Sequence, residues 1–219
     1  MSATAETLIR NLTARGVRLS RNADRLRIEA PAGTVTPELK QVLAERKQDL
    51  LAALDQRERL HALAAAAGIE AALVDGLSAE QLSFCESLDD AGAGSYLCVV
   101  RDDQLRQQGR VPPDETAVAV CVHCGPVWVW PHVVAVSPHI GGFARVAGCA
   151  WCTNRARGLP IPRPPVSCGA CEHFERDSVN PPAGIGRCRI GMDKGPAPYP
   201  FAERTCASWR PSTEAEASA

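Results

Sequence analysis

Four cysteines in the second half of the chain constrain its fold more than any other feature. They form two C-x-x-C pairs, Cys121 with Cys124 and Cys149 with Cys152, separated by 24 residues. A C-x-x-C turn brings two thiolates to one ion, and two such turns complete the tetrahedral ligand set that Zn²⁺ prefers. Gly125 directly follows the first pair and suits a tight turn. The spacing therefore predicts a structural zinc site formed by these four residues, the first cysteine set.

A second cysteine set follows with looser spacing. Its members are Cys168, Cys171, Cys188 and Cys206. One C-x-x-C pair and two single cysteines still supply four ligands, so we expect a second zinc ion here. An iron–sulfur cluster remains an alternative at this set, because such clusters also use four thiolates. His173 lies close to the pair, and we interpret it as an ordinary surface histidine.

A redox role for the first C-x-x-C pair is less favoured. A thioredoxin-like pair lies where a strand enters a helix of a βαβ unit. Here Cys124 is followed by Gly125 and Pro126, which make a poor start for a helix. Cys85 and Cys98 lie in apolar helical contexts, and we expect them to be buried, unreactive thiols.

The N-terminal sequence and the length of the apolar runs indicate the cellular compartment in which we expect the protein. The sequence MSATAETLIRN lacks the basic and apolar regions of a signal peptide. No apolar run is long enough to cross a bilayer. We therefore expect a cytoplasmic protein without a membrane segment, in a compartment where disulfides are rare and clustered cysteines more often bind metal.

Strand-like segments accompany the first cysteine set. Residues 127–130 and 145–147 are expected to form strands, and the motifs CVHCG and GCAWC resemble those of zinc ribbon proteins. Trp128 and Trp130 would share one strand face. We interpret them as the small core of the ribbon, with a stacking platform for single-stranded nucleic acid as the alternative.

The charge of the tail argues against nucleic acid. Residues 117–219 carry 10 Lys and Arg against 7 Asp and Glu. Four thiolates around Zn²⁺ leave a net charge of −2 at each site, so two sites would bring this region to about −1. A strongly basic surface is what phosphate binding needs. We therefore do not favour nucleic acid as the partner.

The first residues predict a small α/β unit. Apolar residues at helical spacing predict a helix around residues 8–12. Alternating apolar and charged residues predict a hairpin with strands at 17–20 and 25–30. Thr36 is expected to cap a further helix at 37–54, which begins at a proline.

The middle of the chain is expected to be helical. Helices are predicted at 60–67, from a capping box at 78–81 to about residue 88, and at 96–108. The sequence VPPDE at 111–115 is a rigid polar break, where we place a domain boundary.

The head sequence LIRNLTARGVRLSRNADRLRIEAPAGTVTPELKQVLAERKQDLLAAL resembles a known family. At "L..L..RGV.L", "DRLRI.AP.G" and "TPEL...L...K..LLA.L", over residues 5–55, it is similar to the TubC-type N-terminal docking domains of nonribosomal peptide and hybrid megasynthases. The resemblance implies a small α/β unit, often a homodimer, that receives a partner's C-terminal peptide along its hairpin. The arginines that it would offer to an acidic peptide are Arg18, Arg25 and Arg27, with Arg21 at the turn.

Together these features predict an α+β protein in five parts. The parts are a docking-like α-hairpin-α head at 1–58, a helical connecting region at 59–112, a zinc-ribbon-like module at 113–158, a second four-cysteine module at 166–210 and a disordered tail at 211–219. A stiff proline-rich linker at 159–165 separates the two cysteine modules.

No catalytic constellation stands out, and neither a condensation-type HHxxxDG motif nor a carrier-type GG-x-S motif is present. The whole layout resembles uncharacterised proteins of bacterial plasmids and integrative elements. We therefore expect a non-enzymatic interaction protein with two structural metal sites. The alternatives are a nucleic-acid-binding zinc protein of a mobile element and an iron–sulfur or redox protein.

Overall fold

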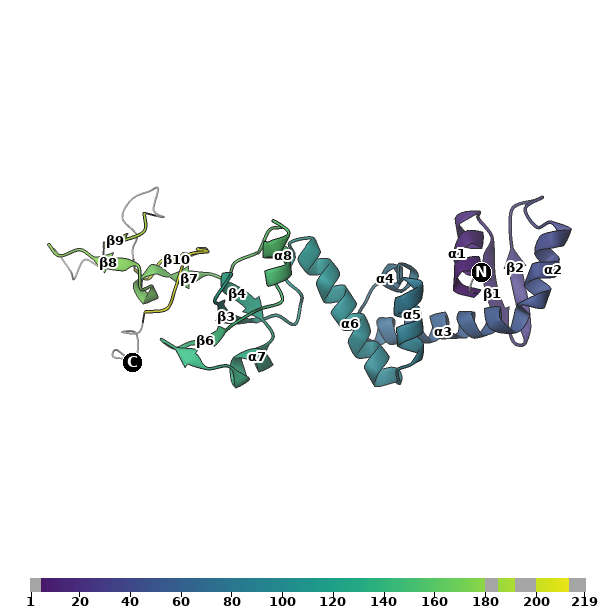
Figure 1. The fold of residues 1–219 in the computed structure, drawn as a ribbon, viewed down its shortest axis with the longest axis horizontal. Helices are drawn as coiled ribbons and strands as arrows, with labels where there is room; N and C mark the ends of the chain where they lie inside the picture. Colours follow the sequence, from purple (N-terminus) through teal and green to yellow (C-terminus); the bar gives the residue numbers. More distant parts are fainter. Residues whose placement is uncertain (1–4, 180–184, 192–199, 213–219) are drawn as a thin grey trace. The chain divides into compact units, whose positions relative to one another are not determined.

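The computed structural model describes residues 5–179, 185–191 and 200–212 (Figure 1). The chain divides into two compact units, residues 1–101 and 102–219. Helices alternate with several small sheets, which confirms the α+β class. Among the described residues, no helix combines the length and the apolar character needed to span a bilayer.

The head contains three helices and one hairpin. Its elements are α1 (Ala5–Ala14), β1 (Arg18–Asn22), β2 (Arg25–Glu29), α2 (Pro37–Glu45) and α3 (Lys47–Ala66). Buried side chains from all three helices and from the residue before β1 form one apolar cluster, which comprises Ile9, Leu12, Val17, Leu43 and Leu50. The predicted helix–hairpin–helix order is therefore confirmed.

The hairpin has a turn of only two residues. β1 and β2 pair antiparallel with Asn22 opposite Arg25, so Ala23 and Asp24 make the turn. Ala23 has a positive φ of 54°. Leu19, Leu26 and Ile28 pack on the core cluster of the head, so one face of the hairpin is apolar and the other is polar, as predicted.

The helices after the hairpin differ from prediction at one point. Thr36 caps α2 as expected, because its Oγ1 accepts a hydrogen bond of 3.2 Å from the N–H of Leu39. The single helix predicted at 37–54 is wrong, because the chain breaks at Arg46. α3 then runs without interruption to Ala66, since residues 55–59 contain neither glycine nor proline.

Three helices follow α3, and the last of them crosses from the first unit into the second between residues 101 and 102. They are α4 (Ala71–Asp75), α5 (Ala79–Glu86) and α6 (Asp90–Gln107). The capping box at Ser78 and Gln81 is confirmed, with both reciprocal hydrogen bonds present. α6 begins six residues before the predicted Tyr96, and Asp89 accepts a hydrogen bond of 2.8 Å from the N–H of Gly92 in its first turn. An aspartate cap thus outweighs the low helix propensity of two glycines.

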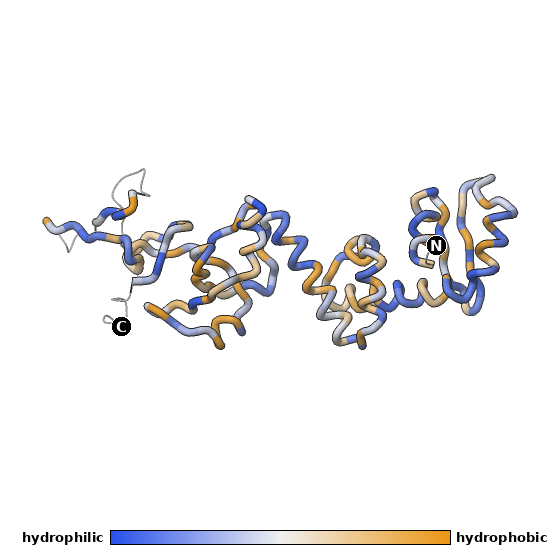
Figure 2. The backbone as a smooth tube through the Cα atoms, in the orientation of Figure 1, coloured by the Kyte–Doolittle hydropathy of each residue, from blue (hydrophilic) through white to orange (hydrophobic). Residues whose placement is uncertain are grey.

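The second unit contains a four-stranded sheet. Its elements are β3 (Ala117–Cys121), β4 (Gly125–Val129), α7 (Pro131–Val136), β5 (His139–Ile140), β6 (Phe143–Val146) and α8 (Cys152–Ala156). The strand order is β4-β3-β6-β5, and β3 pairs antiparallel with β4 but parallel with β6. Figure 2 shows that β3 and β4 are mostly apolar, whereas the end of α6 is hydrophilic.

The core of this sheet is not the one predicted. Val127 and Val129 are buried, so Trp128 and Trp130 lie on the other face of β4 and are only half-buried. Trp151, which is fully buried, fills the core instead. The prediction that Trp128 and Trp130 form the ribbon core is therefore wrong, although they do share a face.

The last part of the second unit consists of short elements. They are β7 (Val166–Ser167), the 3₁₀ turn η1 (Cys168–Ala170), β8 (Phe174–Arg176), β9 (Gly186–Cys188) and β10 (Glu203–Arg204). β7 pairs with β10 and β8 pairs with β9, both antiparallel. Of the tail predicted to be disordered, Pro211 forms a bridge with Cys171, and residues 213–219 lie outside the described residues.

Candidate functional site

The first cysteine set lies at one end of the four-stranded sheet. Cys121 ends β3, and the tight turn to β4 carries Cys124. The parallel pairing of β3 with β6 places Cys121 opposite Val146, just before Cys149. Cys152 begins α8. The sheet therefore brings together two pairs that are far apart in the sequence.

The sulfur positions fit a single metal ion. The Sγ atom of Cys152 lies 3.7 Å from those of Cys121 and Cys124 and 3.8 Å from that of Cys149. All four sulfurs lie within 4.8 Å of one another. A tetrahedron with Zn–S bonds of 2.3 Å has edges of about 3.8 Å. A disulfide would need a separation of about 2.05 Å, and all ten cysteines are thiols.

Without an ion, Cys124 and Cys149 of this set resist ionisation, whereas Cys152 ionises more easily. Burial raises the pKa of Cys124 to about 11, helped by its hydrogen bond with Cys152 and by the charge of Cys121. Burial and the neighbouring thiols also raise the pKa of Cys149. Burial raises the pKa of Cys152 too, but hydrogen bonds from the Cys149 N–H and the other thiols outweigh it and lower that pKa. A bound cation would stabilise the thiolates.

A buried polar network supports the second pair of this set. The indole N–H of Trp151, between Cys149 and Cys152, donates to Glu115 Oε2 at 3.0 Å. Glu115 also accepts from Arg106 at 2.8 Å, and both side chains are almost completely buried. Burial raises the pKa of Glu115, and the Arg106 guanidinium opposes this. Sequence reasoning missed this network, because VPPDE indicated only a polar break.

The cysteines of the second set line a pocket, and their sulfurs are less closely gathered than those of the first set. The four cysteines of the second set and His173 line one pocket of about 220 Å³. Within the described part of the chain, only the first set gathers its sulfurs within 4.8 Å. Burial raises the pKa of Cys171, with further contributions from the charges of Cys206 and Cys188. Of the helical thiols, Cys85 is buried as expected, whereas Cys98 is partly exposed.

A groove of about 870 Å³ runs along β1 in the head. α1, β1 and α3 supply most of its lining, and Asp75 of α4 contributes as well. The lining residues are Ile9, Arg10, Thr13, Ala14, Arg18, Leu19, Ser20, Arg21, Leu54, Arg57, Glu58, His61 and Asp75. The groove thus combines apolar side chains with charges of both signs.

The four predicted partner-binding arginines do not share one environment. Arg21 pairs with Asp55 of α3, so it lies on the apolar face of the hairpin. Arg27 pairs with Glu29 at 3.0 Å. Arg18 and Arg25 are exposed and have no ion-pair partner among the residues that the structure describes. The polar face therefore offers Arg18 and Arg25 most directly.

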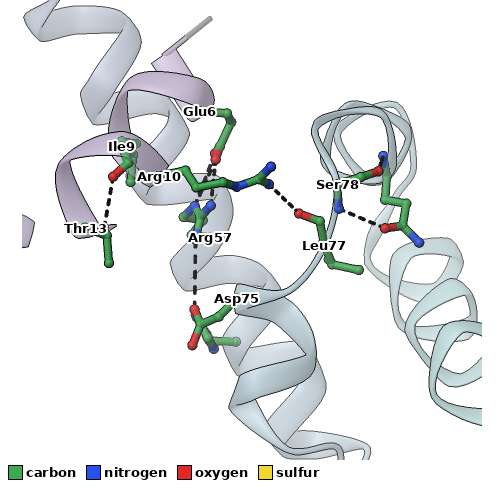
Figure 3. A network of polar contacts seen from close by, with 10 residues as sticks. Glu6, Ile9, Arg10, Thr13, Arg57, Asp75, Leu77 and Ser78 are labelled. Carbon is green, nitrogen blue, oxygen red and sulfur yellow. Dashed lines mark hydrogen bonds and ion pairs between the residues drawn. The ribbon is translucent and has the colours of Figure 1, made fainter. Parts of the chain in front are cut away.

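Polar contacts beside the groove join the head to the following helices (Figure 3). Arg57 of α3 binds Glu6 of α1 at 2.8 Å and lies 3.9 Å from Asp75. Arg10 donates to the carbonyl of Leu77 at 2.7 Å. These contacts fix α1 against the α3–α4 region, and no local sequence signal predicts them.

The comparison with protein families bears directly on this head. The model of the TubC N-terminal docking domain matches residues 6–56. The match covers about a quarter of the chain, so the head alone is similar to these docking domains. It indicates a role in docking between proteins. Comparisons with curated proteins and with solved structures gave no match.

Proposed function

We propose that the protein is a non-enzymatic docking protein whose head binds an extended acidic peptide of a partner, while zinc at the first cysteine set stabilises its second unit. The docking-domain match to residues 6–56 carries the proposal. The groove along β1 is the surface that we assign to the peptide.

The register of the hairpin supports strand addition at β1. In a hairpin with a two-residue turn, the pair that closes the turn is hydrogen-bonded, and such pairs alternate along the strands. Asn22, Ser20 and Arg18 therefore direct their backbone groups toward β2. Leu19 and Arg21 direct theirs toward the free edge. An added peptide strand would form its main-chain hydrogen bonds there.

The surroundings of this edge suit a peptide that alternates acidic and apolar residues. Arg18 and Arg25 lie on the polar face of the hairpin. Leu19, whose side chain lies on the opposite face, lines the groove together with Leu54 and Arg18. Since successive side chains of a strand point to opposite faces, acidic residues of the peptide would meet the arginines and apolar residues would enter the groove.

Zinc is the ion that we assign to the first cysteine set. Sulfur separations of 3.7–3.8 Å around Cys152 equal the edge of a tetrahedral zinc–thiolate site. In a cubane cluster each thiolate binds a different iron, so the sulfurs stand farther apart. For the second cysteine set, both zinc and an iron–sulfur cluster stay predictions.

Nucleic acid remains the second candidate partner, and one observation weakens it. The ring of Trp130 stacks on His132 with 5.9 Å between centroids, and the Arg106 guanidinium lies 5.1 Å from the Trp130 centroid. Trp130 is therefore engaged within the protein and offers a poor stacking platform. A cytoplasmic location, a homodimer through the head and a mobile-element context stay predictions.

Peptide display against the full-length protein tests the docking role. We expect selected peptides to alternate acidic and apolar residues and to bind more weakly at high salt. Exposed ion pairs are weak, so Arg18→Glu with Arg25→Glu should reduce affinity by about 2- to 30-fold. The matched control is Arg155→Glu with Arg157→Glu, which makes the same charge change on exposed residues of the second unit. Equal loss in both double variants would contradict the proposal.

A further inference from the structure

The pocket of the second cysteine set is built by two strand pairings. β7 pairs with β10, with Ser167 opposite Glu203. Cys168 directly follows Ser167, and Cys206 lies three residues after Glu203. This pairing therefore brings two cysteines to the pocket, although 37 residues separate them in the sequence.

The other pairing places the remaining two cysteines. β8 pairs with β9, with Phe174 opposite Cys188. The N–H of Phe174 donates to the carbonyl of Cys171 at 3.0 Å, and the N–H of Arg189 donates to the carbonyl of His173 at 2.8 Å. Cys171, in the turn before β8, and Cys188, at the end of β9, thus reach the same pocket.

The backbone turn of Cys168 and Cys171 matches one in the first cysteine set. The N–H of Cys171 donates to the carbonyl of Cys168 at 2.9 Å. The N–H of Cys152 donates to the carbonyl of Cys149 at 3.1 Å in the same i to i+3 pattern. In that pair the two sulfurs lie 3.8 Å apart, which is the spacing that a tetrahedral ion requires.

A second glycine-assisted turn follows Cys188. The N–H of Gly191 donates to the carbonyl of Cys188 at 3.1 Å, and Gly191 has a positive φ of 67°. Gly125, which directly follows Cys124, also has a positive φ, of 78°. Glycine adopts this conformation without steric cost. Both cysteine sets therefore combine a C-x-x-C turn with a turn that ends at glycine.

We propose that this pocket is a second metal site, in which Cys168, Cys171, Cys188 and Cys206 bind one Zn²⁺. Four soft thiolates select Zn²⁺ over the harder divalent ions. The sulfurs stand farther apart than in the first set, so the ion draws them to separations of about 3.8 Å. His173 lines the same pocket and interacts with Glu172 at 3.5 Å. We leave it outside the ligand set because the four cysteines already complete a tetrahedral site.

The surroundings show why an ion is needed here. Only three buried apolar residues, Val120, Val166 and Trp209, make up the cluster beside the pocket in the described part of the chain. Such a small core stabilises little by itself. Structural zinc sites supply folding free energy directly, because the unfolded chain has no preformed site.

Metal counting on the full-length protein tests the proposal. Protein purified without oxygen should contain two zinc ions by elemental analysis and native mass spectrometry. Cys168→Ser with Cys188→Ser should reduce this to one, and so should Cys121→Ser with Cys149→Ser. Each pair of substitutions reports on its own site, so failure of the second site is distinguished from failure of the first.

Two controls separate the ligands from other cysteines and from His173. Cys85→Ser with Cys98→Ser, and separately His173→Ala, should each keep two ions. Loss of one ion in His173→Ala would overturn the ligand set. A single zinc ion in the wild-type protein would overturn the second site. An unchanged number of zinc ions in the variant with Cys168→Ser and Cys188→Ser would overturn it as well.

A spectroscopic measurement covers the case in which these variants do not fold. Wild-type protein loaded with ¹¹³Cd²⁺ should give two cadmium resonances, both at the shifts of four-thiolate sites. A single resonance would overturn the proposal. Bound iron at the second set, revealed by visible absorbance of protein purified without oxygen, would overturn the assignment to Zn²⁺.

Discussion

Removing Arg106 should destabilise the second unit through the carboxylate that it leaves behind. Arg106 and Glu115 form an ion pair of 2.8 Å, and their side chains are 7% and 1% exposed. Breaking such a buried pair costs about 3–5 kcal/mol, because one charge stays in the interior without its partner. We expect Arg106→Met to lower the free energy of unfolding by this amount near pH 8.

The pH dependence of this loss identifies its cause. Burial raises the pKa of Glu115, and Arg106 opposes that effect. Without Arg106, the pKa of Glu115 in the folded protein should rise further above its unfolded value. A carboxyl group with a raised folded pKa stabilises less as pH increases. The cost of Arg106→Met should therefore be smaller at pH 5.5 than at pH 8.

Tryptophan fluorescence during urea unfolding measures this effect in the second unit alone. All four tryptophans of the chain lie in that unit: Trp128, Trp130, Trp151 and Trp209. Arg155→Met is the matched control, since Arg155 is exposed, and it should change the free energy of unfolding by less than about 0.5 kcal/mol. Replacing both partners, by Arg106→Met with Glu115→Leu, should recover much of the loss. A cost below about 1 kcal/mol at pH 8, or one independent of pH, would refute the reasoning.

Three further predictions concern other parts of the chain. Ala23→Gly should raise the free energy of unfolding of the head by up to about 1 kcal/mol in thermal unfolding, because Ala23 adopts a left-handed φ of 54° that glycine adopts more easily; Ala30→Gly, without that φ, should not. Hydrogen bonds from Arg187 and Arg189 lower the pKa of Glu175, so NMR titration should show it ionised at lower pH than an ordinary glutamate, and Arg187→Gln should raise that pKa. Cys121→Ser should make residues 117–157 sensitive to limited proteolysis while residues 1–60 stay protected, since zinc binding stabilises only the second unit; equal protection of both regions would contradict this.

Features with a local physical signal could be predicted from the sequence. The sequence predicts Thr36 as a helix cap because Pro37 follows it, and Ser78 because Gln81 completes a capping box. Both side chains accept hydrogen bonds from residues three positions later. The sequence predicts the first cysteine set because each C-x-x-C turn brings two thiolates to one ion, and the four sulfurs do lie close together. In each case the signal lies within a few residues.

Features that depend on distant contacts could not be predicted. Trp151 fills the core and reaches Glu115, which lies 36 residues earlier in the chain. The ion pair of Arg21 with Asp55 depends on the packing of α3 against the hairpin. The sequence therefore could not show whether the charge of Arg21 is balanced by an acidic residue of the protein or is available to a partner. The break at Arg46 has neither glycine nor proline to mark it.

Backbone amide exchange in the head tests the docking account most directly. On binding of a selected acidic peptide to the full-length protein, the N–H groups of Leu19 and Arg21 should exchange at least ten times more slowly, because they form new hydrogen bonds with the added strand. The N–H of Ser20 should change little, since it already faces β2. Binding that leaves the exchange of Leu19 and Arg21 unchanged would contradict strand addition at β1.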